Sequence, residues 1–257
     1  MIEELKHYEN MLKIVETISA QMPELIFVEM DKNKYKNRYY NSYFLLCSEI
    51  FRGLLLCCHA ISIGAYSQIG TMLRQLIEQL ATVNIIGKND LVRAEYNKFG
   101  SARTKFFINH NDTHDLKALY EASEVVQERI KKLKAQHKPV PKINYANNKF
   151  FSLGWLEKCG ATSFSEHELL VYGNLNSFIK RRSFFNHYVH SQIFVVAYGN
   201  NMLYAVKDFM LCIGVVFNDL LCSYNYVTGF DFYFDEHNNK IEFNKHMQPI
   251  IEENNKK

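Results

Sequence analysis

Two arginines and two histidines stand close together late in the chain. Arg181 and Arg182 begin the stretch RRSFFNHYVH, and His187 and His190 follow in it. A histidine titrates near neutral pH and can move a proton as a general acid or base. An arginine stays charged and can stabilise the negative charge that develops on a phosphate. These residue types therefore fit acid–base chemistry on a phosphate group.

Helical spacing would bring the polar residues of this stretch onto one face. On a helix over 183–198, Asn186, His187 and His190 share a face with Ser183, and the two histidines lie one turn apart. Residues five apart differ by about 140° around a straight helix, so Arg182 and His187 cannot meet on one. Either the helix begins after Arg182, or a second copy of the chain supplies one of the two residues.

A metal site is the first alternative for the histidine pair. Histidines at i and i+3 can ligate one metal, and Glu49, Glu78 or His59 could complete the site. The Glu-x-x-His repeats of di-iron bundles, H-E-x-x-H and C-x-x-C pairs are all absent from the sequence. We therefore expect no metal and no cofactor.

The arginine–histidine spacing resembles the motif of the HEPN superfamily (higher eukaryotes and prokaryotes nucleotide-binding). Arg182 and His187 form R-x4-H, and Arg181 with His187 forms R-x5-H. The resemblance implies a helical bundle that acts as a homodimer and cleaves RNA without a metal, as a toxin or phage-defence effector. His187 or His190 would then be the acid or base, and Arg182 or Arg181 would hold the phosphate. Implied partners are RNA, a second copy and an antitoxin or other protein.

A second resemblance covers residues 43–198. An apolar helix carries Arg74 and Glu78 as R-x3-E, on the flank between its polar face and its predicted core stripe of Ile69, Leu73, Leu76, Ile77 and Leu80. A Trp-containing stretch follows, and Asn186 to Ser191 read N-H-Y-V-H-S. This order is similar to that of a group of uncharacterised bacterial and phage-associated helical proteins. The resemblance carries no activity, but it implies that Arg74, Glu78 and His190 converge in one polar cluster.

Three more polar residues fall on one ridge of an apolar helix predicted over 41–64. They are Glu49, Arg52 and His59, and Glu49 is close enough to Arg52 to pair with it. A structural interpretation makes them an ion pair and a hydrogen-bonded histidine at the edge of the core. If the polar residues are structural throughout, the chain is a non-enzymatic helical interaction or regulatory protein, and the cluster of Arg74, Glu78 and His190 only holds helices in register.

The composition limits the class of protein. The chain has 257 residues, 47% of them hydrophobic, and a formal net charge of +3, which is too small to indicate a partner by itself. The six cysteines mostly lie in apolar runs, which indicates free thiols in a reducing compartment. The N-terminus does not resemble a signal peptide, and the run 209–217 is too short to span a bilayer. We expect a cytoplasmic protein with no membrane segment.

The elements that must position these residues are mainly helical. With 4 Pro and 11 Gly, the chain favours long helices. Apolar spacing predicts helices over 2–20 (ended by Pro23), 41–64, 65–86, 90–109, 115–136, from 163 onward, and over 200–226. Ser165 and Glu168 fit a capping box. The predicted fold is a multi-helix bundle over 1–228, a small β-hairpin over 229–246 packed on it, and a flexible tail over 247–257.

Overall fold

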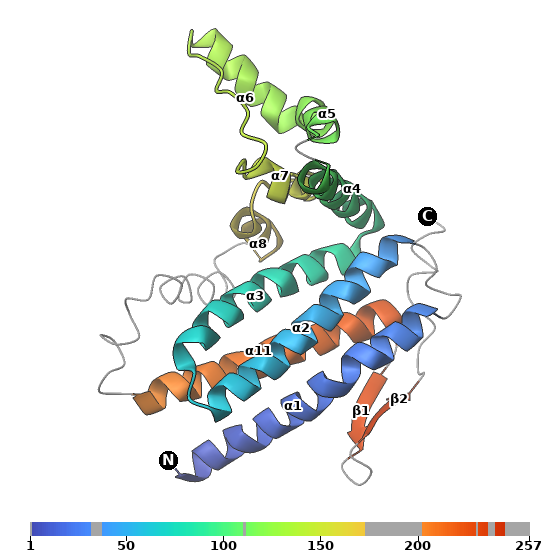
Figure 1. Ribbon diagram of the computed structural model, residues 1–257, viewed down its shortest axis with the longest axis vertical. Helices are drawn as coiled ribbons and strands as arrows, with labels where there is room; N and C mark the ends of the chain where they lie inside the picture. The colour runs from blue at the N-terminus through green and yellow to red at the C-terminus, as the bar shows by residue number, and fades with distance from the viewer. Residues whose placement is uncertain are drawn as a thin grey trace. The chain divides into compact units, whose positions relative to one another are not determined.

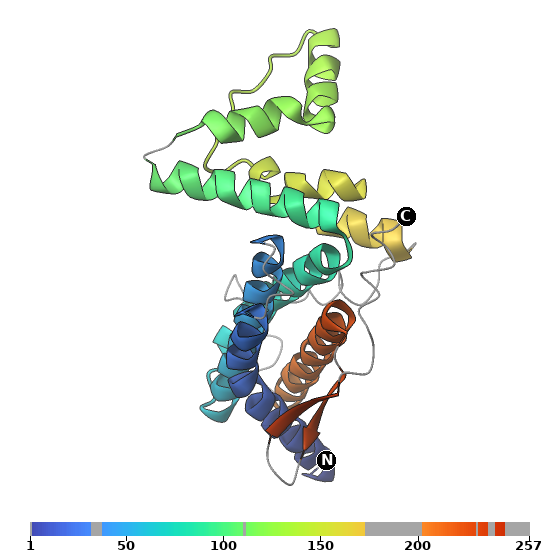
Figure 2. The same ribbon diagram turned by 90° about the vertical axis from the view of Figure 1, so that its right-hand side faces the viewer.

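The computed structural model is mainly helical. It describes residues 2–31, 38–109, 112–172, 202–229, 231–235 and 240–244. By their internal contacts the residues group into two compact units, which is a finer division than the single bundle predicted over 1–228. Unit 1 holds α1, α2, α3, α11 and the two strands, and unit 2 holds α4 to α8 (Figures 1 and 2).

In the part of unit 1 that the structure describes, four long helices bury apolar stripes against one another. They are α1 (Ile2–Asp31), α2 (Arg38–Ser62), α3 (Tyr66–Lys88) and α11 (Met202–Thr228). The helix α11 packs on the other three, as its apolar composition predicts. The predicted stripe of α3 is confirmed, because all its residues are buried: Ile69, Leu73, Leu76, Ile77 and Leu80.

The first helix passes through Pro23 and continues to Asp31, so the predicted end near residue 20 is wrong. A proline inside a helix removes one hydrogen bond and costs about 3 kcal/mol. On either side of it, Met22 and Ile26 are fully buried. Each such side chain contributes about 1.5–3 kcal/mol on burial, so tertiary packing offsets the penalty.

The turn between α2 and α3 is closed by Gly64. Its backbone has φ +74°, the left-handed conformation that glycine adopts without strain. The Gly64 amide bonds the carbonyl of Ile61, and the Ala65 amide bonds that of Ala60. These two bonds satisfy the last carbonyls of α2 and return the chain so that α3 packs against it.

Two short strands follow α11. They are β1 (Asp231–Asp235) and β2 (Lys240–Asn244), which pair antiparallel. In this register Asp231 lies opposite Asn244, and Asp235 lies opposite Lys240.

Unit 2 is built around aromatic side chains. Its elements are α4 (Asp90–Ile108), α5 (His114–Ala122), α6 (Glu124–Ala135), α7 (Phe150–Leu153), the 3₁₀ helix η2 (Gly154–Cys159) and α8 (Phe164–Tyr172). Trp155 is buried, meets Tyr96 of α4 and Phe164 of α8 edge to face, and donates its ring N–H to the Ser152 carbonyl. It therefore ties the irregular stretch before α8 to α4.

The helix predicted over 115–136 is two helices that break at Ser123. At this residue the backbone is extended, with ψ 121°. Its hydroxyl accepts the Val126 amide at 3.1 Å, which caps α6, and donates to the Glu157 carboxylate at 2.7 Å. Apolar spacing continues across this position, so only these hydrogen bonds mark the break.

The N-terminus of α8 is capped two residues earlier than predicted. Ser163 accepts the amide of Glu166 at 3.2 Å, and the Glu166 carboxylate accepts the amide and hydroxyl of Thr162, both at 2.7 Å. These bonds hold the pKa of Glu166 below its usual value. The predicted partner Glu168 is instead buried.

Candidate functional site

The residues of the arginine–histidine motif lie outside the residues that the structure describes. This applies to Arg181, Arg182, Asn186, His187 and His190, which fall between α8 and α11 in the sequence. The catalytic roles inferred for them, and the convergence of His190 with Arg74 and Glu78, stay predictions.

Arg74 and Glu78 form a partly exposed ion pair on α3. The guanidinium and the carboxylate are 3.6 Å apart, and the two side chains are 36% and 35% exposed. This agrees with a position on the flank between the buried and the solvent faces. The Arg74 Nε is buried and, within the described residues, has no hydrogen-bond acceptor. A buried donor of this kind needs a partner, and a ring nitrogen or an amide oxygen would supply one.

Glu49 and Arg52 pair across one turn of α2 at 2.6 Å, but they face solvent rather than the edge of the core. Their side chains are 57% and 50% exposed, and Leu56 on the same ridge is 57% exposed. The reason is that α2 buries its opposite face, which includes Cys47 and Leu54. An exposed pair of this kind contributes less than about 1 kcal/mol.

His59 pairs with α1 rather than with its neighbours on the ridge. Its Nδ1 lies 3.7 Å from the Glu16 carboxylate, and its side chain is 72% exposed. The predicted polar residues of unit 1 that are described therefore form separate pairs, one on α3, one on α2 and one between α1 and α2.

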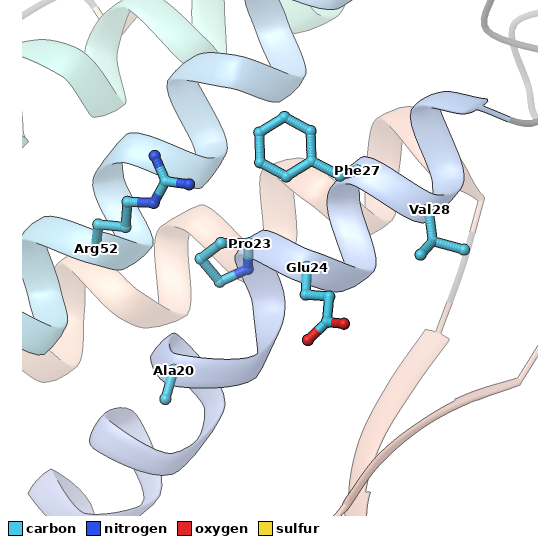
Figure 3. Close-up of a pocket in the computed structure, with 6 residues that line it drawn as sticks. All are labelled: Ala20, Pro23, Glu24, Phe27, Val28 and Arg52. Atoms are coloured by element: carbon cyan, nitrogen blue, oxygen red, sulfur yellow. The ribbon is translucent and has the colours of Figure 1, made fainter.

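A hollow lies beside Pro23, where α1 and α2 meet (Figure 3). It encloses about 480 Å³ and is lined by Ala20, Pro23, Glu24, Phe27, Val28 and Arg52. The guanidinium of Arg52 lies 5.9 Å from the centre of the Phe27 ring, and its charge is also engaged by Glu49. These lining side chains include no histidine, thiol or hydroxyl. Glu24 is the single carboxylate among them, and no second acid–base or nucleophilic side chain stands beside it to form a catalytic set.

A second hollow, of about 380 Å³, lies between α1 and α11. It is lined by Asn10, Met11, Ile14, Val15, Gly214, Phe217 and Asn218. Apart from the two asparagines, the lining is apolar, and no titratable side chain takes part. This hollow offers no acid–base or nucleophilic side chain.

Buried hydroxyl and thiol groups in unit 1 are held protonated. Tyr43 shares a hydrogen bond of 3.3 Å with Ser223, which joins α2 to α11. Burial raises the pKa of Tyr43, and burial raises the pKa of Cys47 and of Cys58 to about 12. Because a nucleophilic cysteine must be a thiolate, these thiols act as small apolar side chains.

Unit 2 contains a buried charge that the sequence analysis missed. Arg93 is almost fully buried and donates to the half-exposed Asp90 carboxylate at 2.9 Å. The sequence feature that could have predicted this pair is an acidic and a basic residue three apart at the start of α4. An acidic residue there also interacts favourably with the helix dipole. The pair lies in the first turn of α4.

The described residues contain no group of three His, Cys, Asp or Glu side chains that could hold a metal ion. They contain one helix long and apolar enough to cross a membrane, Asn41–Ser62 of α2. Half of its most apolar window is buried, so packing on the other helices of unit 1 accounts for much of its composition.

Comparisons of the chain with protein-family models, with curated proteins and with solved structures found no match.

Proposed function

We propose that this protein is a metal-independent ribonuclease of the HEPN type, which acts as a toxin or phage-defence effector. The observation that carries the proposal is the R-x4-H spacing of Arg182 and His187, with His190 three residues further along the sequence. The mainly helical fold agrees with that superfamily. The hollows and buried thiols of the described residues offer no competing set of catalytic groups.

The proposed reaction needs only acid–base groups and a cation. The 2′-hydroxyl oxygen of a ribose attacks the adjacent phosphorus, and the bond from phosphorus to the 5′ oxygen breaks. One histidine takes the 2′-hydroxyl proton, and the other gives a proton to the departing 5′ oxygen. Arg182 or Arg181 stabilises the extra negative charge on the phosphate. The products are a 2′,3′-cyclic phosphate and a 5′-hydroxyl, so no metal or other cofactor takes part.

The proposed setting is a cytoplasmic homodimer held in check by an antitoxin or other protein partner. Arg182 and His187 cannot meet on one straight helix, because residues five apart point in different directions. In a dimer, a second copy can bring its Arg182 to the first copy's His187. In this arrangement the hairpin over 229–246 packs on the helices, since an isolated two-stranded hairpin is only marginally stable.

Alanine substitution tests the proposed catalytic pair. His187→Ala should remove RNA cleavage, because loss of a general acid or base lowers the rate by about 10²–10⁴-fold. Arg182→Ala should remove it as well, because the charge that develops on the phosphate is then no longer stabilised. The melting temperature should stay nearly constant, since catalytic side chains in an open site make few packing contacts. Cleavage of a labelled RNA and thermal unfolding are measured on the same samples, with Arg181→Ala in parallel.

Two exposed residues provide matched controls. His114 is 87% exposed and Arg52 is half exposed, so His114→Ala and Arg52→Ala should leave both cleavage and melting temperature unchanged. The opposite pattern supports the non-enzymatic interaction protein. In that case the wild type never cleaves RNA, and removal of His187 or Arg182 lowers stability by about 1–3 kcal/mol by stranding a buried partner. The buried Nε of Arg74 is the described feature that favours this rival.

A further inference from the structure

A short part of unit 2 is rich in positive charge. Residues 129–142, which we call the basic segment, hold six of the chain's 30 lysines and arginines and no acidic residue. The rest of the chain has 24 basic against 27 acidic residues, a formal charge of −3. The small net charge of the whole protein is therefore the sum of a strongly basic segment and a remainder with a slight excess of acidic residues.

The basic segment is presented to solvent. It consists of the second half of α6 and the loop that follows, and α6 projects beyond α4 and α5 in both views (Figures 1 and 2). Only Val126 of α6 is buried. All the cations are exposed: Arg129, Lys131, Lys132, Lys134, Lys138 and Lys142. At 100° per residue, the four cations of α6 surround the side of the helix opposite its apolar stripe.

Most of these charges are not neutralised within the described residues. Lys132 pairs with Glu128 at 2.8 Å. The other five have no ion pair among the described side chains. Lys132 and Lys134 lie in the last turn of α6, where a favourable interaction with the helix dipole explains the presence of cations. Arg129, Lys138 and Lys142 lie outside that turn, so the dipole does not explain them.

The middle of the basic segment also carries backbone strain. His137 follows α6 with φ +54°, in the left-handed region where glycine is the usual residue. The His137 amide bonds the Lys134 carbonyl at 3.0 Å, and the Lys138 amide bonds the Leu133 carbonyl at 2.9 Å. An imidazole therefore stands where glycine would be more stable, among five free cations. Strain of this kind is often kept where the side chain has a use.

The apolar content of this region argues against insertion into a membrane. A helix that lies in a bilayer interface needs large exposed apolar side chains such as Trp, Phe or Leu. Here the exposed apolar side chains are Val125 and Val140, while Ile130 and Leu133 are half-buried. Many cations with little apolar surface fit a hydrated polyanion better than a lipid surface.

We propose that the basic segment binds the phosphate backbone of RNA, so that unit 2 holds the substrate strand. The choice of RNA rather than another polyanion rests on the proposed ribonuclease function. Exposed lysines bind phosphates without regard to sequence, and each contact releases counterions from the nucleic acid. The segment would therefore supply affinity, while the arginine–histidine motif would supply the chemistry.

Binding is measured with the full chain and a labelled, 2′-O-methylated single-stranded RNA of about 20 nucleotides, which lacks the attacking hydroxyl and stays intact. The test variant combines Lys131→Gln, Lys134→Gln and Lys138→Gln. Each lost phosphate contact lowers the slope of log affinity against log salt by about 0.7, so we expect a slope smaller by about 2. At about 0.1 M salt the affinity should fall by about 100-fold.

A matched control keeps the net charge equal. Lys6→Gln, Lys13→Gln and Lys158→Gln remove three exposed lysines outside the basic segment, and the affinity should change by less than about threefold. Equal losses in both triple variants would show a net-charge effect and overturn the proposal. Absence of RNA binding by the wild type, with binding to phosphatidylserine vesicles that the test variant loses, would also overturn it.

The two proposals fail in different ways. If the wild type binds the methylated RNA through the basic segment but never cleaves unmodified RNA, the proposal of an RNA-binding segment is supported and the ribonuclease proposal is refuted. If the test variant binds and cleaves RNA as well as the wild type does, the ribonuclease proposal is supported and the proposal of an RNA-binding segment is refuted.

Discussion

At the scale of single residues, burial and backbone conformation decide what a side chain can do. Cys47 and Cys58 lie in the core, and their raised pKa values keep them as thiols. Glu49 and Arg52 are an ideal pair by spacing, yet their exposure makes the pair weak. His137 is exposed and strained, which marks it as a residue whose replacement should raise stability.

Replacing His137 with glycine should stabilise the protein by about 1 kcal/mol, because a left-handed backbone costs a non-glycine residue about that much. The free energy of unfolding is measured by urea titration. The neighbouring Gln136, with φ −89°, is the control, since glycine there relieves no strain. Gln136→Gly should therefore leave stability unchanged or lower it, and a similar gain in both variants would contradict the assignment of strain to His137.

At the scale of elements, helix ends and crossings depend on contacts that are remote in sequence. Pro23 does not end α1, because residues on both sides of it are buried by other helices. Ser123 does end α5, because its hydroxyl is engaged by Val126 and Glu157. Whether a glycine of unit 2 can be replaced by alanine also depends on the side chains packed against it.

Two glycine-to-alanine substitutions in unit 2 should have opposite effects. A Cβ at Gly154 would lie 2.7 Å from ring atoms of Phe99 and Phe150, so Gly154→Ala should destabilise by about 1–3 kcal/mol through overpacking. A Cβ at Gly100 of α4 meets open space, so Gly100→Ala should stabilise by up to about 1 kcal/mol through helix propensity. Urea unfolding of both variants checks this. Shifts of the same sign would contradict the packing around Gly154.

At the scale of the whole molecule, the chain combines a core of buried thiols in unit 1 with a basic projection in unit 2. Burial, followed by the neighbouring Cys58 and Cys212, raises the pKa of Cys57 in that core. A group whose pKa is raised on folding stabilises the protein fully below its unfolded pKa, near 8.5 for cysteine. That stability is lost as the pH rises from there towards the folded pKa.

The stability of the protein should therefore fall at alkaline pH, by about 1.4 kcal/mol per pH unit for each buried thiol. In Cys57→Ala, the slope of unfolding free energy against pH between about pH 9 and 11 should be smaller by about one proton. Cys222→Ala is the control, because it removes an exposed thiol rather than a buried one. An unaltered slope in Cys57→Ala would contradict the buried, protonated thiol.

The sequence alone determined the helical class and several helices. Apolar residues at helical spacing predicted α3, α4 and α11 to within two residues, and the predicted stripe of α3 is buried. Arg74 and Glu78 were placed between the two faces of their helix, where the structure has them. These features depend on neighbours three and four residues apart, which a sequence displays directly.

Tertiary structure alone decided which ridges face solvent, where α1 ends and where α5 gives way to α6. The ridge of Glu49, Arg52 and His59 has the same local pattern whether it lies at the edge of a core or on the surface. The packing of α2 on α1, α3 and α11 selects the surface. Pro23 shows the energetic reason. A local penalty of about 3 kcal/mol is outweighed when side chains far apart in the sequence bury apolar surface together.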